Sequence, residues 1–396
     1  MFHDRLKKWA VARGYRTATA SADVLDVVRK KLEGRRKAGM IEAGFFAKNL
    51  SGFRYLDGSG ISGRKSLVMV AVPSPVSILP FRLGEKRIDG LIPPTYVQYK
   101  KTFEDVLADL KANVLMAEDD ATGAEILSAP LKSLAVHMGL VSYGRNNITF
   151  APGLGSGYQL CGYVVATRNN LGSDMGGSGT ASTEGRQKRA SEIIEAKGEN
   201  GSPDWKEKVM DRCSSCRACF EVCPTGAIRE DRFLISAERC YTLFSESREP
   251  MPEWIRPPKS ICMIGCMACQ EICPENKGRL RYEASGEEFT AEETEAVLDM
   301  GRRFAAGGEM GGSARDKEKG DKGGRDKGEG EKEARGRRTA ADSVKHGKIV
   351  DGGCARLASE SARDKLNRLG MSEDIEVIAR NLWILLDQRG LIGSPR

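Results

Sequence analysis

One run of residues organises this chain, and it reads Cys213-Ser-Ser-Cys216-Arg-Ala-Cys219-Phe-Glu-Val-Cys223-Pro224. A shortened second copy follows, and it reads Cys266-Met-Ala-Cys269-Gln-Glu-Ile-Cys273-Pro274. The second copy lacks the first cysteine of the pattern, and Cys240, which lies between the copies, can replace it. The spacing C-x2-C-x2-C-x3-C-P is typical of runs that bind iron–sulfur clusters. The eight thiolates are enough for two [4Fe–4S] clusters with four ligands each.

The spacing also indicates which cysteines share a cluster. A cubane takes one thiolate at each of four irons, and three cysteines at x2 intervals can wrap around three of them. The fourth cysteine is followed by a proline that does not continue a helix, so it points away and ligates the other cluster. We therefore predict crossed ligation. The first set is Cys213, Cys216, Cys219 and Cys273. The second set is Cys223, Cys240, Cys266 and Cys269.

Two other uses of cysteine compete with iron–sulfur binding. Structural zinc sites use paired C-x2-C motifs, and three cysteines at this spacing with a fourth and a proline are not a usual zinc pattern. Disulfide bonds need an oxidising compartment. The segment 1–9 has charges without a following apolar stretch, so we expect no secretory signal. Two clusters in a cytoplasmic protein are the favoured interpretation.

The overall charge gives little reason to expect a polyanionic partner. The 396 residues carry a formal net charge of +7 at pH 7. Part of that charge lies in the glycine-rich, charged segment 307–338, which we expect to be disordered. Each oxidised cubane with four thiolates adds about −2 by charge counting, so the holoprotein would be near neutral. The sequence has no run of about 18 apolar residues, and we expect no membrane partner.

Hydrophobic periodicity predicts an α+β fold. We expect helices at 4–32, 96–115 and 129–138, and strands at 66–73, 148–150 and 160–167. The apolar run at 66–73 indicates a strand that is buried on both faces. Near the C-terminus, Gly370 and the helical spacing after Ser372 predict a pair of helices.

These patterns divide the chain into five parts. We predict an N-terminal α/β domain at 1–168, a flexible linker with a short helix at 169–204, and a ferredoxin-like dicluster domain at 205–282. We predict a largely disordered, low-complexity segment at 283–345 and a C-terminal helical hairpin at 346–396.

Four segments of the chain resemble epoxyqueuosine reductases. They are the segments 134–147, 213–228, 237–241 and 265–276. The first is similar to the family's LAxRAGLGWIGKN, and the last is similar to its GCxxCQxxCPxN. The resemblance is strongest in the cysteine-rich half.

The resemblance implies two [4Fe–4S] clusters and a cobalamin. It implies an N-terminal domain like those of flavin-dependent nitroreductases and reductive dehalogenases, with electrons passing through the clusters to cobalt to reduce an epoxide on a tRNA base. The segment 140–147 would lie beside the corrinoid, with Tyr143, Arg145 and Asn146 as cofactor-binding residues. The implied partners are an electron donor (a ferredoxin, a flavodoxin or a reductase) and tRNA.

One position departs from the family. Relatives carry an acid in a VDSAPV-like segment, where it is interpreted as the proton donor. Here the segment is Ile126-Leu127-Ser128-Ala129-Pro130-Leu131, and Leu127 has no proton to give. The catalytic residue is therefore unassigned. Three hypotheses follow: an iron–sulfur oxidoreductase of unknown substrate, a ferredoxin-type electron-transfer protein without substrate chemistry of its own, or a tRNA-binding protein with structural clusters. The third would require RNA affinity with a steep salt dependence.

Overall fold

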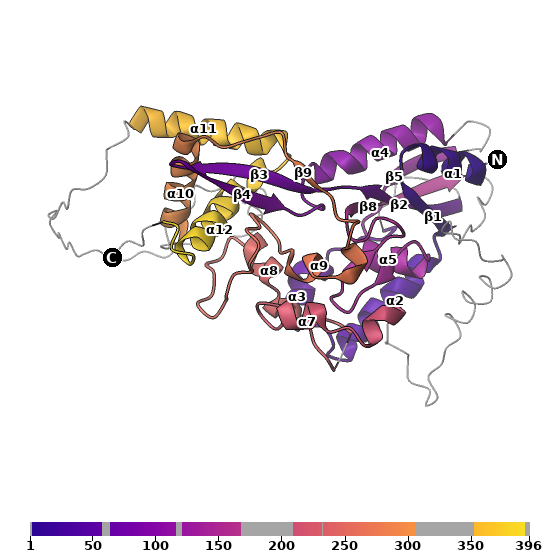
Figure 1. The fold of residues 1–396 in the computed structure, drawn as a ribbon. Coiled ribbons are helices and arrows are strands. Elements are labelled where there is room, and N and C mark those ends of the chain that lie inside the picture. Colours follow the sequence, from indigo (N-terminus) through magenta and orange to yellow (C-terminus); the bar gives the residue numbers. More distant parts are fainter. Residues whose placement is uncertain are drawn as a thin grey trace, which may run out of the picture.

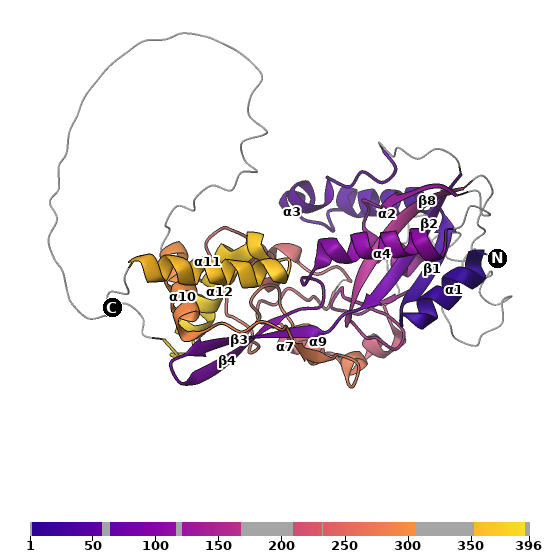
Figure 2. The same cartoon turned by 90° about the horizontal axis from the view of Figure 1, so that it is seen from above.

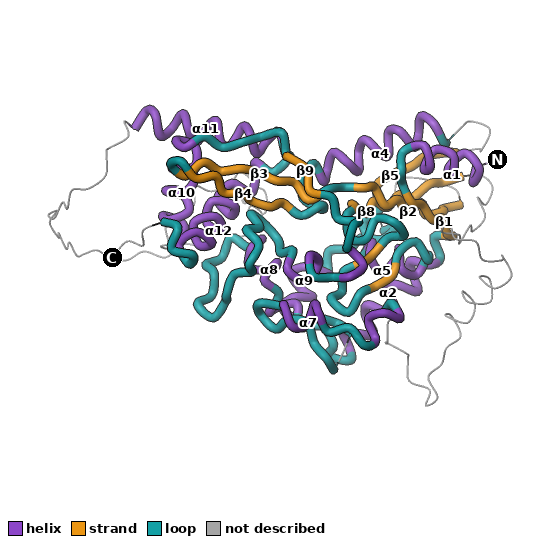
Figure 3. Tube along the Cα trace, viewed as in Figure 1, coloured by secondary structure: helices purple, strands orange, loops and turns teal. Residues whose placement is uncertain are grey.

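The computed structural model describes residues 2–57, 64–115, 121–167, 209–231, 233–305 and 352–392. Two sheets lie toward opposite ends of the molecule, and each packs with its own helices (Figure 1). The cysteine-rich region lies below and between them as short helices joined by long loops (Figure 3). The cysteine-rich region therefore lies next to both parts of the fold, the one around the larger sheet and the one around the smaller sheet.

The larger sheet has four antiparallel strands in the order β1-β2-β8-β5. Their bounds are β1 Arg16–Ser21, β2 Arg64–Pro73, β8 Tyr158–Thr167 and β5 Ala121–Ile126. In the central pair, Met69 of β2 lies opposite Gly162 of β8. A side chain at Gly162 would meet Leu131 at 2.7 Å, so a glycine lets the helix layer approach the sheet closely.

Helices cover both faces of this sheet. Figure 1 shows α1 (Phe2–Ala12) and α4 (Tyr99–Asn113) above it, and α2 (Val24–Lys37) and α5 (Leu131–His137) below it. Figure 2 shows α4 lying over β2 and β8. Alternate residues of β2 enter two separate apolar cores, Val68 on one side and Met69 on the other. The strand predicted at 66–73 is therefore confirmed as buried on both faces.

The single helix predicted at 4–32 is wrong. The structure has α1, then β1, then α2 over this range. Gly14 takes a φ of +69°, which ends α1 because left-handed backbone favours glycine. The alternating Thr17 and Thr19 then favour a strand over a helix, since β-branched residues are restricted in helices.

The smaller sheet joins distant parts of the chain. It has the order β4-β3-β9, with β3 Val76–Leu83, β4 Lys86–Ile92 and β9 Tyr282–Ala284. The hairpin β3–β4 shares an apolar core with α10 (Ala291–Ala305), α11 (Gly352–Arg368) and α12 (Ile375–Asp387). The hairpin therefore packs with the C-terminal helices, although it lies within the range 1–168 that the sequence assigns to the N-terminal domain.

The start of the range 283–345 forms regular structure, whereas the sequence predicts a largely disordered, low-complexity segment there. Residues Tyr282–Ala284 form β9, and Ala291–Ala305 form α10, whose Val297 is 1% exposed. The glycine-rich composition that suggested disorder begins only after this helix. The linker 169–204 and the segment 307–338 lie outside the described residues.

Short elements complete the fold. They are α3 Ala43–Phe45, β6 Ser142–Tyr143, β7 Thr149–Phe150, α7 Ala218–Val222, α8 Tyr241–Glu246 and α9 Ala268–Glu271. β7 pairs with β6 and not with β8. Within the described ranges, no helix combines the length and the apolar character that crossing a bilayer requires.

Candidate metal centre

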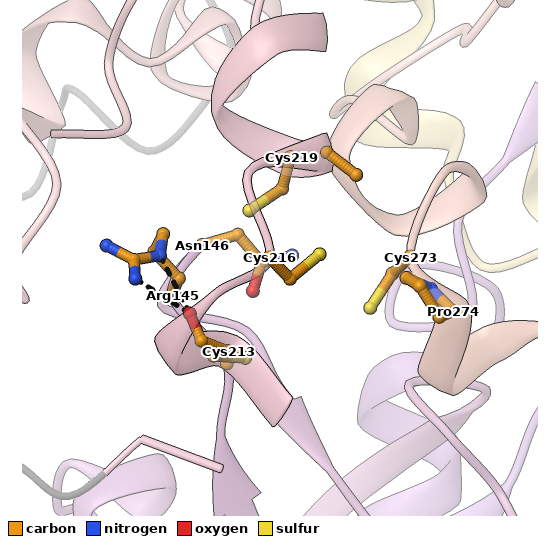
Figure 4. Close-up of a pocket in the computed structure, with 9 residues that line it drawn as sticks. Arg145, Asn146, Cys213, Cys216, Cys219, Cys273 and Pro274 are labelled. Atoms are coloured by element: carbon orange, nitrogen blue, oxygen red, sulfur yellow. Dashed lines mark hydrogen bonds between the residues drawn. The ribbon is translucent and has the colours of Figure 1, made fainter. Parts of the chain in front are cut away.

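The first set of cysteines surrounds one cavity. Cys213 lies in a short 3-10 turn, Cys219 lies on α7, and Cys273 follows α9 in the second run. Together with Cys216 they line a single cavity, and Figure 4 shows the four side chains around it. The cysteine from the distant run thus closes the ring that the first three begin.

The charges that act on these thiols group them in the same way. Burial raises the pKa of Cys219 to about 11, and the nearby Cys213, Cys273 and Cys216 raise it further. Burial also raises the pKa of Cys273, on which Cys213 and Cys216 act in the same direction. A thiol is harder to ionise beside other thiolates, so each shift reports close neighbours.

The second set forms another group. Burial raises the pKa of Cys266 to about 12, and Cys240 and Cys223 add to the shift. Burial raises the pKa of Cys269 well above its ordinary value, with Cys266, Cys240, Cys219 and Cys223 as further causes. Cys219 of the first set also acts on Cys269, so the two sets lie close to each other. Their ligation of clusters stays a prediction.

The donor set suits iron–sulfur clusters. Thiolates are the ligands of these clusters, and each group offers four of them. The hydroxyl of Tyr241, which follows Cys240 directly, is buried and has no hydrogen-bond partner within the described residues. Burial raises its pKa, and the first charges that add to the shift are Cys266 and Cys262. An orphaned donor beside thiols fits a site that awaits an acceptor.

A tight turn of the N-terminal domain holds both cysteine runs. Arg145 donates to the carbonyl of Cys213 at 2.7 Å and 3.2 Å and to that of Ser214 at 3.3 Å (Figure 4). Asn146 is 4% exposed, and its Nδ2 donates to the carbonyl of Cys269 at 3.2 Å. Asn147 takes a left-handed φ of +59°, which lets the turn reverse here. The turn therefore fixes the first run and the second run relative to each other.

The sequence assigns Tyr143, Arg145 and Asn146 to cofactor binding. The structure places them beside the cysteines, with Arg145 and Asn146 in the wall of the first set's cavity. Tyr143 is 3% exposed, and its hydroxyl lies 3.2 Å from that of Ser133. The backbone carbonyl of Tyr143 accepts from Met210, just before the first cysteine run, at 2.9 Å. All three residues thus bind protein groups that support the cysteine loops.

Lys132 and Tyr96 lie near the second set, and of the two only Lys132 was missed by sequence reasoning. Lys132 of α5 donates to the carbonyl of Asn147 at 3.2 Å. Desolvation lowers the pKa of Lys132, although the residue keeps solvent-exposed surface, and Cys240 and Cys269 oppose that shift. Tyr96 binds the carboxylate of Glu246, and burial raises the pKa of Tyr96. The available signal for Lys132 was a lysine in the first turn of a short helix that is apolar at four of its seven positions.

Leu127 offers no acid. Its side chain is 4% exposed and lies in the apolar core between the larger sheet and α5. Its backbone nitrogen donates to the carbonyl of Gly162 at 2.9 Å. The side chain is therefore fixed in a hydrocarbon environment.

The cysteine-rich region matches a known domain family. Residues 212–276 match the 4Fe-4S double cluster binding domain. The chain is 35% identical over 72 residues to the epoxyqueuosine reductase of Bacillus anthracis. That match covers 18% of this chain and 19% of that protein. It is 44% identical over 66 residues to the epoxyqueuosine reductase of Synechococcus sp. (strain CC9605). That match covers 16% of this chain and 20% of that protein. The matched segment thus spans about a fifth of each relative's length.

The likeness in fold extends further than the likeness in sequence. The structure of epoxyqueuosine reductase from Streptococcus thermophilus matches this one with a TM-score of 0.51 at 20% identity. The match covers 74% of this chain and 71% of that chain. The chain is thus epoxyqueuosine reductase-like in its mixed α+β fold and carries a 4Fe-4S double cluster binding domain.

Proposed function

We propose that this chain is an iron–sulfur oxidoreductase that passes electrons through two [4Fe–4S] clusters to a site in its N-terminal domain. The observation that carries the proposal is the cavity that Cys213, Cys216, Cys219 and Cys273 line together with residues 144–146 of that domain. The clusters supply one-electron transfer when they are bound. The crossed sets are Cys213, Cys216, Cys219 and Cys273, and Cys223, Cys240, Cys266 and Cys269.

The chain's own residues fix the two groups and limit their access to water. Arg145 and Asn146 hold the backbone of both runs. Desolvation raises the pKa of Cys266 and Cys269, so the cluster-free protein keeps these two thiols protonated at neutral pH. Loading the site must therefore release protons. The same burial strengthens every charge interaction in the loaded site, because the local dielectric is low.

A cobalamin is implied by the resemblance, but the described residues do not fit it well. The side chains expected to face a corrinoid are Tyr143, Arg145 and Asn146, and their polar atoms already bind other parts of the protein. We derive no step through that cofactor. A tRNA partner stays a prediction, to be tested by the salt dependence of binding to an isolated stem loop.

The apolar position 127 favours a second candidate function. A ferredoxin-type carrier without its own substrate chemistry needs the clusters but needs no proton donor. Leu127 fits that requirement, since its core position excludes an acid.

One preparation separates the two functions. The protein is purified anaerobically, and the co-purifying organic cofactor is identified by visible spectrum and mass. A stoichiometric flavin or corrinoid would support the oxidoreductase. Clusters alone, with electron exchange to an added ferredoxin or flavodoxin, would support the carrier. Stoichiometric zinc without acid-labile sulfide would refute both.

A further inference from the structure

The C-terminal helix α12 buries two polar side chains against the cysteine-rich region. Arg380 and Asn381 are both 0% exposed. The rest of the buried face of α12 is largely apolar and packs in the core shared with α10 and α11. Buried polar groups cost stability unless they are hydrogen-bonded. Their partners therefore indicate what this helix does.

Arg380 binds the loop that follows Cys240. Its Nη1 donates to the carbonyls of Ser247 at 2.7 Å and Glu249 at 2.5 Å. Its Nη2 donates to the carbonyl of Phe244 at 2.8 Å, and Nε donates to Asn381 Oδ1 at 3.2 Å. All of these acceptors are uncharged oxygens. The guanidinium is thus satisfied as a donor while its positive charge is left to act on its surroundings.

Asn381 binds near both ends of the segment that connects Cys240 to Cys266. Its Nδ2 donates to the carbonyl of Ser245 at 2.8 Å and to that of Met263 at 2.9 Å. Ser245 lies five residues after Cys240, and Met263 lies three residues before Cys266. The helix therefore clamps the segment that connects these two cysteines of the second set.

The charge of Arg380 reaches the second set through Tyr241. Tyr241 is 2% exposed, and its hydroxyl is the orphaned donor described above. The charges that act on it include Cys266 and Cys262, which raise its pKa, and Arg380 and Arg389, which lower it. Arg380 in turn has Tyr241 as the charge that acts on it. Tyr241 follows Cys240 directly and lies three residues before Phe244, whose carbonyl accepts from Arg380, so it lies in the segment between a cysteine of the second set and the contact with α12.

We propose that α12 and Tyr241 form an electropositive wall for the second cluster, which makes that cluster easier to reduce than it would otherwise be. Tyr241 donates its hydroxyl hydrogen to a sulfur at that site, and Arg380 contributes a buried positive charge behind it. Asn381 holds the loop so that both groups stay in place. This inference rests on the proposed two-cluster function and adds an electrostatic difference between the two sites.

The direction of the effect follows from charge balance. In the test, dithionite supplies one electron, and the site changes from a net charge of about −2 to about −3 by charge counting. No proton or bond is exchanged in this step. A buried cation and a hydrogen-bond donor stabilise the more negative form more strongly, and hydrogen bonds to sulfur and nearby charge are known determinants of cluster potential.

The sharpest test is Tyr241→Phe in the full-length, anaerobically prepared holoprotein. The hydroxyl has no partner in the cluster-free protein, so its removal leaves the cluster-free unfolding midpoint unchanged or slightly raised. In the holoprotein, the midpoint potential of the second cluster becomes more negative, and that of the first cluster does not move. The readout is a redox titration followed by electron paramagnetic resonance. Tyr158→Phe is the control, because that buried hydroxyl binds Thr149.

Arg380→Met tests the charge. We expect the equilibrium constant for reducing the second cluster to fall about tenfold, which is 59 mV for a one-electron couple. Arg380→Lys keeps the charge and should restore most of the potential. The control is Arg363→Met, which removes an arginine that binds Glu376 on the solvent side of α12. If Arg380→Met does not assemble its clusters, the lysine variant and Tyr241→Phe decide.

Unchanged second-cluster potentials in both Tyr241→Phe and Arg380→Met would overturn the inference. So would an equal shift in Arg363→Met or Tyr158→Phe. If Arg380→Met does not assemble its clusters, a midpoint potential of the second cluster in Tyr241→Phe equal to that of the wild type would also overturn the inference. Wild-type protein without two clusters would instead refute the proposed function, so the two failures are distinguishable.

Discussion

Two arginine–asparagine pairs hold the two groups of cysteines, and their surroundings differ. Arg145 and Asn146 lie on a tight turn of the N-terminal domain and bind the carbonyls of Cys213 and Cys269. Arg380 and Asn381 lie on a helix at the other end of the chain and bind the loop between Cys240 and Cys266. The first pair lines a cavity, whereas the second pair is fully buried.

The difference shows how burial changes the role of the same two side chains. Arg145 is half-buried, so water and salt screen its charge more than that of Arg380, and it acts mainly as a geometric support. Burial lowers the pKa of Arg380 to about 10, which still leaves it charged at neutral pH. A buried charge acts strongly on its neighbours because the effective dielectric is low. The predictions below test this contrast from the largest expected effect to the smallest.

Crossed ligation predicts the loss of one whole cluster in each of two variants. Cys223→Ala should lose the second cluster and keep the first, because Cys223 groups with Cys240 and Cys266. Cys273→Ala should do the reverse, because it lines the cavity of the first set. Each variant should retain about four irons, as one cubane does. Iron analysis and the spectrum of the reduced protein measure this. The grouping is wrong if Cys223→Ala and Cys216→Ala lose the same cluster.

The apolar position 127 predicts poor epoxyqueuosine reduction. General acids contribute about 10²–10⁴-fold to rates, and Leu127 has no proton to donate. We expect turnover of an epoxyqueuosine-containing tRNA stem loop to be slower than in acid-bearing relatives by about that factor, while the clusters still accept electrons. Single-turnover assays with reduced protein measure the rate. A rate equal to that of acid-bearing relatives would show that the acid lies elsewhere.

The complementary variant is Leu127→Asp. It places a carboxyl in the apolar core that contains Leu134 and Met69. We expect it to destabilise the fold, since burying an unpaired charge is costly. Leu127→Ile, measured beside it in urea, is the control for a change of shape alone. A gain in reduction by Leu127→Asp would support the alignment with relatives.

The two arginines should differ in their effect on stability. Arg380→Met leaves several buried carbonyls without partners, and we expect a loss of about 3–5 kcal/mol of unfolding free energy, as for breaking a buried charged network. Arg145→Met removes hydrogen bonds at the rim of a cavity, and we expect a loss of about 0.5–1.5 kcal/mol. Urea unfolding of both cluster-free variants measures the difference. Equal losses would remove the contrast between the two pairs.

The stability of the cluster-free protein should also fall at high pH. Burial raises the pKa of Cys266 to about 12, above its ordinary value of 9.0. A group with a raised folded pKa adds stability below its unfolded pKa, and that stability is lost as the pH rises through the folded value. We expect the unfolding free energy to decline between about pH 9 and 12, and less steeply in Cys266→Ala. A flat profile there would argue against a desolvated thiol.

The sequence predicted the centre better than its surroundings. The cysteine spacing is a local pattern typical of iron–sulfur runs, so it indicated the 4Fe-4S double cluster binding domain that residues 212–276 match, while the two ligand sets stay a prediction. The hairpin β3–β4 was not predicted to pack on α10–α12, because that contact joins segments about 200 to 300 residues apart. Arg380 had no local signal, since a lone arginine in an amphipathic helix usually faces solvent. The helix predicted at 4–32 failed because Gly14 was not read as a helix end.

Iron and acid-labile sulfide in anaerobically purified wild-type protein test the central claim most directly. Two cubanes predict about eight irons and eight sulfides per chain, with a visible absorbance that bleaches when dithionite is added. Redox titration of the same sample should then resolve two one-electron steps. Stoichiometric zinc without acid-labile sulfide would contradict the account.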